Sequence, residues 1–125
     1  MAKEYPRTRR VAEQLVRELS EVIRDEVKDP RLGPVTVTDV EVSRDLRYAK
    51  VFVSFLGQRE GRMEKLAVLT HAAGFIRHEL GERVVMKVIP RLRFEYDESL
   101  DEAERLDRLI DAARAEDADK AGHGH

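Results

Sequence analysis

The sequence predicts a two-layer α+β domain in which helices cover one face of a three-stranded sheet. Apolar residues recur at helical spacing in three segments and alternate at strand spacing in three others. These segments follow in the order helix, strand, strand, interrupted helix, strand and C-terminal helix. A sheet of this kind needs one apolar face covered, which the first two helices can do. The 125 residues, of which 42% are hydrophobic, are enough for one such core.

The first helix is predicted over residues 7–27. Its apolar side chains return every three or four positions and form one buried stripe, which consists of Val11, Leu15, Leu19, Val22, Ile23 and Val27. Pro6 lies where the helix begins. Pro30 and Pro34 follow the helix, and proline ends helices because it disfavours helical geometry in the preceding residue and has no amide donor.

Two strands that form an antiparallel hairpin are predicted next. The first covers residues 35–42, and its alternation slips at Thr38-Asp39, which predicts a β-bulge or a local twist. A polar turn at residues 43–47 leads to the second strand, over residues 48–55. One face of this strand carries Ala49, Val51, Val53 and Phe55, and the other carries Tyr48, Lys50 and Phe52.

A second helix is predicted after a loop at residues 57–61, with its end at Gly81. Its apolar stripe consists of Met63, Leu66, Leu69, Ala73, Ile76 and Leu80. Gly74 interrupts this pattern. A glycine inside a helix costs about 0.5–1 kcal/mol relative to alanine, so we expect a kink or a close backbone approach at Gly74.

The last strand is predicted over residues 84–96, and a further helix follows it. The strand has one apolar face and one basic face, and Pro90 places it at a sheet edge or at a bulge because proline lacks a ladder donor. Ser99 and Glu102 match a capping box, which opens an amphipathic helix over residues 98–115. We therefore expect a folded domain over residues 1–97, this helix, and a disordered tail over residues 116–125.

Three segments of the chain resemble one known family. They are residues 40–54 across the hairpin, residues 72–77 at the helix interruption and residues 89–97 on the last strand, with a weaker match at residues 9–13. Together they span about residues 5–110. The element order is similar to that of a type II KH-like domain, and the segments themselves resemble the ribosome-binding factor A family.

The resemblance implies a non-enzymatic factor that binds the small (30S) ribosomal subunit and its 16S rRNA. It also implies assistance in late maturation, including processing of the 5′ end of the rRNA, and a part in cold adaptation. Members of this family have an Ala-x-Gly kink where ordinary K-homology domains have a Gly-x-x-Gly loop, and Ala72, Ala73 and Gly74 match that kink. Since Gly-x-x-Gly loops clamp single strands, we expect the stiffer kink to recognise folded RNA shape.

The charges of the chain are distributed unevenly. The net charge of -2 combines a body with 19 Lys and Arg against 15 Asp and Glu over residues 1–96 and a C-terminal part with 4 against 10. This asymmetry is typical of a basic body that binds an anionic partner and carries an acidic tail. An ordinary solvated surface explains the same counts and stays open as an alternative.

The candidate RNA-binding residues are cations suited to phosphate. They are Arg7, Arg9 and Arg10 on the first helix, Arg77 after the kink, and Lys87, Arg91 and Arg93 on the last strand. Arg77 also follows the point where a restarting helix offers amides to an anion. For Arg17 and Arg24 we prefer ion pairs with Glu13 and Glu21 on the same helix. The aromatic residues expected in the core are Phe55, Phe75, Phe94 and Tyr96.

Other functional classes find less support in the sequence. The absence of cysteine excludes thiol catalysis and disulfides, and the spacing of His71 and His78 is not that of a metal site. We expect no cofactor, no metal and no catalytic residue, and a cytoplasmic protein that is monomeric when free and binds no membrane. The alternative hypotheses are a protein-interaction adaptor that acts through its C-terminal helix and, with the weakest support, a hydrolase.

Overall fold

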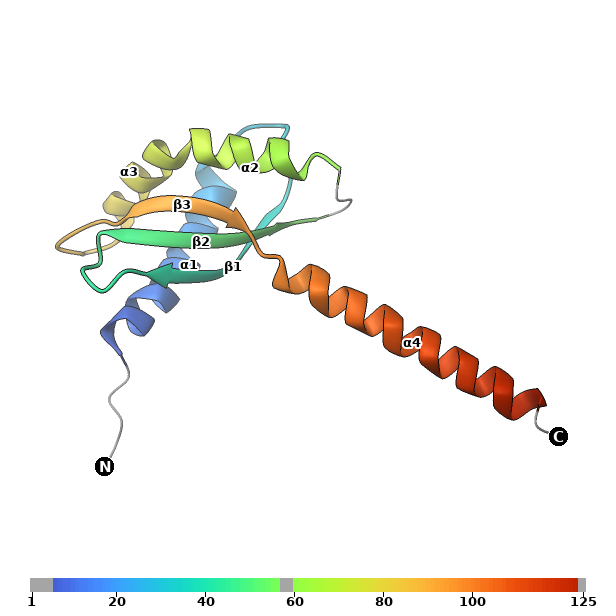
Figure 1. The fold of residues 1–125 in the computed structure, drawn as a ribbon. Helices are drawn as coiled ribbons and strands as arrows, with labels where there is room; N and C mark the ends of the chain where they lie inside the picture. Colours follow the sequence, from blue (N-terminus) through green and yellow to red (C-terminus); the bar gives the residue numbers. More distant parts are fainter. Residues whose placement is uncertain (1–5, 57–59, 124–125) are drawn as a thin grey trace, which may run out of the picture.

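The structure is a computed structural model that describes residues 6–56 and 60–123. Within these residues it contains helices and strands in the predicted order (Figure 1): α1 (Arg7–Glu26), β1 (Val35–Val42), β2 (Tyr48–Phe55), α2 (Arg62–His71), α3 (Ala73–Arg83), β3 (Arg91–Tyr96) and α4 (Ser99–His123). The predicted α+β class and element order are confirmed.

The three strands form one mixed sheet with β2 in the centre. β1 and β2 pair antiparallel, and β3 runs parallel to β2, so β3 is an edge strand that begins directly after Pro90. The register between β1 and β2 shifts between Val37 and Asp39, which leaves Thr38 as the extra residue. The β-bulge predicted from the slip in alternation is therefore confirmed.

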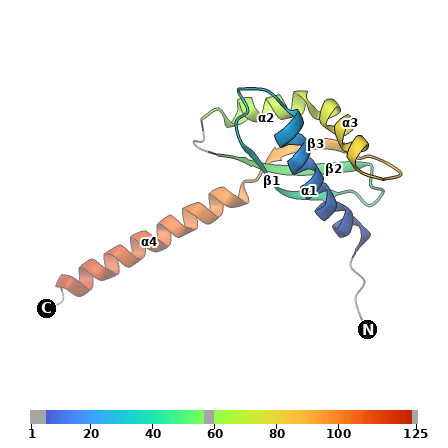
Figure 2. The same cartoon turned by 180° about the vertical axis from the view of Figure 1, so that it is seen from behind.

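Helices α1, α2 and α3 cover one face of the sheet, and α1 crosses that face (Figure 2). The side chains between the two layers form the core, whose fully buried members include Leu15, Leu19, Leu69, Ile76, Leu80, Val51 and Val53. None of the described helices covers the opposite face of the sheet, which we call the open face. The residues of β2 and β3 on the open face are Tyr48, Lys50, Phe52, Ser54, Arg91, Arg93 and Glu95.

The second predicted helix is divided at Ala72. This residue leaves helical geometry, with φ −88° and ψ 2°, and ends α2 while the α3 helix restarts from its carbonyl, which accepts the Ile76 amide at 2.8 Å. The interruption therefore falls at the first residue of the Ala72–Gly74 motif. Of the two alternatives expected at Gly74, a kink is found two residues earlier, at Ala72, whereas a close backbone approach is not, because a Cβ atom at Gly74 would meet nothing within 4 Å.

Two other sequence predictions in this region are wrong. Gly81 does not end the helix, because α3 continues to Arg83. Residues 84–90 are not part of a strand, because β2 begins at Tyr48, which is already opposite Arg91, and no earlier residue of β2 is left for them to pair with. Alternation in this segment therefore does not reflect sheet pairing, and Val85 is fully exposed.

Helix α4 projects away from the body (Figure 1) and runs through His123, whereas the sequence predicts a helix over residues 98–115 with a tail after it. Residues that favour helix continue past residue 115, namely Glu116, Ala118, Lys120 and Ala121. The start of α4 also differs from the predicted capping box. Asp97 is the capping residue, since its Oδ1 accepts a hydrogen bond from the Ser99 amide at 3.0 Å and another from the Ser99 hydroxyl.

Candidate nucleic-acid interface

Three basic segments far apart in the sequence lie at the same end of the molecule, away from α4 (Figures 1 and 2). They are the first turns of α1, the turn between β1 and β2, and the connection from α3 to β3. We call this region the basic end, and its cations are Arg7, Arg9, Arg10, Arg44, Arg47, Lys87 and Arg91. The two strand-side segments are joined directly, because the Arg91 amide donates to the Arg47 carbonyl at 2.8 Å.

The cations of the basic end are exposed, and none of them forms an ion pair with another described residue. Arg93 differs, because its Nε lies 3.6 Å from Oε2 of Glu95 while its side chain remains 78% exposed. The sequence predicts Lys87, Arg91 and Arg93 on one strand, but Lys87 lies in the connection before β3. Lys87 and Arg91 have no acidic partner among the described residues, whereas Arg93 is already paired. The free-energy cost of binding a phosphate is lowest at a cation that does not first have to leave an ion pair within the protein.

Arg77 has a structural contact that the sequence does not predict. Its Nε and Nη2 both donate to the Ile89 carbonyl, at 3.1 and 2.8 Å. This bidentate contact fastens the segment of residues 84–90, which carries Lys87, to helix α3. Arg77 therefore lies beside the basic end and positions part of it, and its exposed guanidinium keeps a donor edge available to an anion.

The turn between β1 and β2 is held by hydrogen bonds. Asp45 Oδ1 accepts from the Ser43 hydroxyl at 2.7 Å and from the Arg47 amide at 3.1 Å. These contacts, with the Ser43 hydroxyl foremost, lower the pKa of Asp45, so the carboxylate stays charged while its oxygen is engaged within the turn. Leu46 adopts φ 63°, which closes the turn. Asp45 thus acts as a turn former, and Arg44 and Arg47 extend from a fixed backbone.

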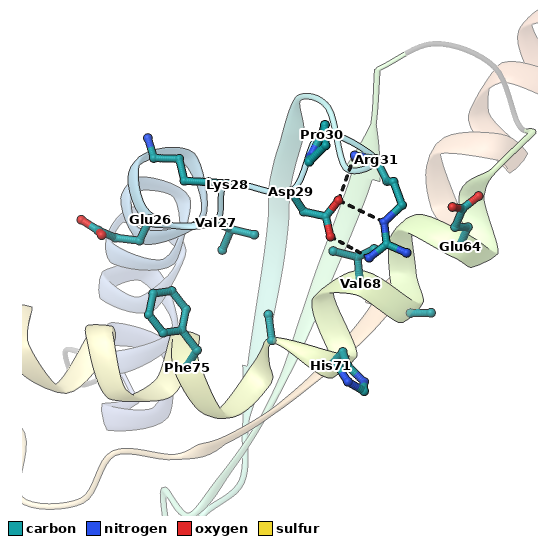
Figure 3. Close-up of a pocket in the computed structure, with 12 residues that line it drawn as sticks. Glu26, Val27, Lys28, Asp29, Pro30, Arg31, Glu64, Val68, His71 and Phe75 are labelled. Carbon is teal, nitrogen blue, oxygen red and sulfur yellow. Dashed lines mark hydrogen bonds and ion pairs between the residues drawn. The ribbon is translucent and has the colours of Figure 1, made fainter.

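The helix interruption borders a separate hollow of about 770 Å³ between the α1–β1 connection and helices α2 and α3 (Figure 3). Ala72 and Phe75 line it on one side. Phe75 is 47% exposed, so the prediction that it belongs to the core is wrong. On the other side Asp29 and Arg31 form an ion pair at 2.7 Å, and the Arg31 guanidinium lowers the pKa of Asp29 to about 2. The hollow shares no lining residue with the basic end.

The ion pairs predicted along α1 are wrong in detail. Arg24 pairs with its neighbour Asp25 at 2.9 Å, and Arg17 forms no ion pair with described residues. Oε2 of Glu21 instead lies 3.5 Å from Nη1 of Arg83 on α3. Arg83 also forms ion pairs with Asp25 and Glu26. Because the two helices cross, the acidic side chains of α1 form ion pairs that join α1 to α3. The spacing of residues along one helix does not show which residues of another helix lie close to it.

One exposed aromatic residue was not among the sequence candidates. Tyr48 is 59% exposed on the open face, beside Arg91 in the register of the sheet. The signal was present in the sequence, because Tyr48 has the opposite phase to Ala49 and Val51. Its exposure depends on the open face having no described helix over it, which only the tertiary structure shows.

The described residues contain neither a cluster of metal-binding side chains nor a membrane-spanning helix. Within residues 6–56 and 60–123, no three or more His, Cys, Asp or Glu side chains are grouped closely enough to hold a metal ion. None of the helices there is both long and apolar enough to cross a bilayer.

Comparison with known proteins decides the family. The sequence profile described as "Ribosome-binding factor A" matches residues 7–110. The chain belongs to the ribosome-binding factor A family. A family member from Alkalilimnicola ehrlichii is 53% identical over 118 residues, which cover 94% of this chain and 91% of that protein. The matched region includes the basic end, the helix interruption and β3.

Solved structures of ribosome-binding factor A agree with this assignment. The crystal structure of the protein from Thermus thermophilus is 34% identical with a TM-score of 0.63, and covers 74% of this chain and 97% of that chain. A second Thermus thermophilus structure, a homology model fitted into the cryo-EM map of a 30S complex, is 34% identical with a TM-score of 0.58, and covers 70% of this chain and 91% of that chain.

Proposed function

We propose that this protein binds the small ribosomal subunit and contacts its 16S rRNA through the basic end. The observation that carries the proposal is the set of exposed cations, contributed by three segments, that have no acidic partner among the described residues. Family membership directs the choice of anion, because the Thermus thermophilus relative was fitted into a 30S complex. Phosphate neutralisation by several such cations supplies much of the affinity for RNA.

The finer role that we propose is that of a non-enzymatic assembly factor in the cytoplasm. In this role the protein assists late maturation of the subunit, including processing of the 5′ end of the rRNA, and supports growth in the cold. It acts as a monomer and needs no cofactor. The Ala72–Gly74 interruption supports a KH-like mode of binding, in which Arg77 and the surface around the interruption contact folded rRNA beside the basic end.

Sedimentation of the protein with purified ribosomal subunits tests this proposal. We expect the protein to migrate with the small subunit and not with the large one, and we expect salt to weaken this association. The large subunit is the matched control, because it also presents a dense surface of rRNA phosphates. Equal association with both subunits, or association that does not respond to salt, would contradict the proposal.

A second candidate function is that of a protein-interaction adaptor that acts through α4. The observation in its favour is an exposed apolar stripe on that helix, where Leu106 is 58%, Leu109 61% and Ile110 40% exposed. Truncation after Glu104 removes this stripe but keeps Asp97 and Asp101, which contact the body. If α4 is the binding element, the truncated chain loses small-subunit binding; if the basic end is, it retains binding.

A further inference from the structure

Tyr48 leaves a large aromatic ring in solvent on the open face of the sheet. It is the first residue of β2, and its side chain lies on the same face as Lys50, opposite to the buried Ala49 and Val51. A hollow of about 440 Å³ adjoins the ring, and its other walls come from Glu41, Val42, Ser43, Ala49, Lys50, Arg91, Leu92 and Arg93. The ring therefore borders a recess that is largely apolar, with charged side chains of both signs among its walls, and does not pack into the core.

The backbone that carries this ring is fixed on both sides. The Tyr48 amide donates to the Ser43 hydroxyl oxygen at 3.1 Å, and the Tyr48 carbonyl accepts from the Ser43 amide at 2.9 Å. On the other edge, the amide of Arg91 is held by the Arg47 carbonyl. A ligand that stacks on Tyr48 would thus meet an ordered strand end, and little backbone entropy would be lost on binding.

The charges around the ring differ between its two sides. Arg47 precedes Tyr48 and Arg91 lies opposite it on β3, and neither forms an ion pair with a described residue. Further along the face, Lys50 and Arg93 lie 3.9 and 3.6 Å from Oε2 of Glu95 and are balanced by it. Anion-binding capacity is thus concentrated next to the ring.

We propose that Tyr48 stacks on an unpaired base of the rRNA while Arg47 and Arg91 hold the adjoining phosphates. This inference rests on the proposed function and specifies the element recognised, an unpaired nucleotide. An aromatic face beside cations without acidic partners among the described residues suits a single-stranded segment, because an unpaired base exposes its flat face and its backbone. A base inside a duplex is already stacked on both sides, and an acidic peptide would engage the cations without needing the ring.

The test measures binding of the full chain to a fluorescently labelled oligouridylate of about ten nucleotides and to an RNA duplex of equal length. The variants are Tyr48→Ala, Tyr48→Phe and, as a control, Met63→Ala, which truncates a side chain that is 86% exposed on α2. We expect Tyr48→Ala to weaken binding to the single strand by about 5- to 100-fold and Tyr48→Phe by less than about twofold, because phenylalanine keeps the ring. Met63→Ala should match the wild type, and duplex binding should not change.

Several results would overturn the inference. One is equal affinity of the wild type and Tyr48→Ala for the single strand, with both folded by circular dichroism. Another is an equal loss in Tyr48→Phe, which would assign the effect to the hydroxyl group, and a third is displacement of the oligonucleotide by polyglutamate as readily as by unlabelled RNA. Sedimentation with small subunits separates this failure from that of the proposed function, since the wild type should still bind them with its salt dependence intact.

Discussion

At the scale of single residues, the structure distinguishes cations that resemble one another in the sequence. Lys87, Arg91 and Arg93 look equivalent by spacing, yet among the described residues only Arg93 of the three lies close to a carboxylate, that of Glu95. Arg77 is engaged by the Ile89 carbonyl, and Tyr48 is exposed because none of the described helices covers the open face, which alternation does not show. Residue type and period predict which side chains can bind an anion, whereas contacts between distant segments decide which of them are available.

Arg91 and Arg93 should therefore respond differently to neutralisation. Arg91→Gln is expected to reduce the magnitude of the log–log salt slope of small-subunit binding by about 0.7–0.9, the value for one phosphate contact. Arg93→Gln should reduce it by less, because part of the Arg93 charge is already balanced by Glu95. Titrations at several salt concentrations measure both slopes. A larger effect of Arg93→Gln than of Arg91→Gln would contradict the assignment.

Asp97 should make stability depend on pH. Hydrogen bonds from Ser99 and then Thr38, the latter at 2.6 Å, lower the pKa of its carboxyl group. A depressed pKa contributes stability that is present above the unfolded-state value of about 3.9 and is lost as the pH falls through the lower folded value. Asp97→Ala should thus reduce the free energy of unfolding by about 1 kcal/mol at pH 7, as for loss of a helix cap.

Urea unfolding of Asp97→Ala and of the wild type, at pH 7 and near pH 3, measures this dependence. The difference between the two proteins should narrow at the lower pH, where the wild-type carboxylate begins to protonate. Asp107→Ala is the control, because Asp107 is exposed on α4. A difference that stays constant with pH would show that the charge of Asp97 contributes nothing.

At the scale of elements, sequence periodicity predicts most of the helices and strands, and its errors have identifiable causes. The slip at Thr38 predicts the bulge, because an extra residue changes the phase of alternation. Residues 84–90 alternate without forming a strand, because alternation does not show whether a partner strand is present. The length of α4 depends on whether helix propensity alone is enough to keep the residues after 115 helical. The amino-acid composition around residue 116 does not decide this.

Gly74 provides a test of the helix interruption. It is exposed inside α3, its φ is not positive, and a Cβ there would meet no atom within 4 Å. Gly74→Ala should therefore stabilise the protein by about 0.5–1 kcal/mol in chemical denaturation, because alanine favours helix. A destabilised variant would show that the backbone at Gly74 has a role that the free protein does not reveal. Reduced small-subunit binding with increased stability would place Gly74 at the rRNA surface.

At the scale of the whole molecule, opposite charges lie at opposite ends. The basic end gathers cations from α1, the β1–β2 turn and the α3–β3 connection, whereas residues 97–123, which carry 10 acidic against 4 basic side chains, leave the body on the other side (Figure 1). Helix α4 is fastened near its start, where Asp101 pairs with Arg62 at 2.8 Å and the Arg62 guanidinium lies over the Tyr96 ring. Under the proposed function, this arrangement would keep the acidic helix from repelling rRNA phosphates at the basic end.

Under the proposed function the basic end neutralises phosphates of the small subunit, and the salt dependence of binding tests this most directly. The measurement compares the log–log salt slope of the wild type with that of a variant carrying Arg47→Gln, Lys87→Gln and Arg91→Gln. We predict a slope smaller in magnitude by about 2 to 3, corresponding to three phosphate contacts, with the fold retained by circular dichroism. A folded triple variant with the wild-type slope would contradict the claim.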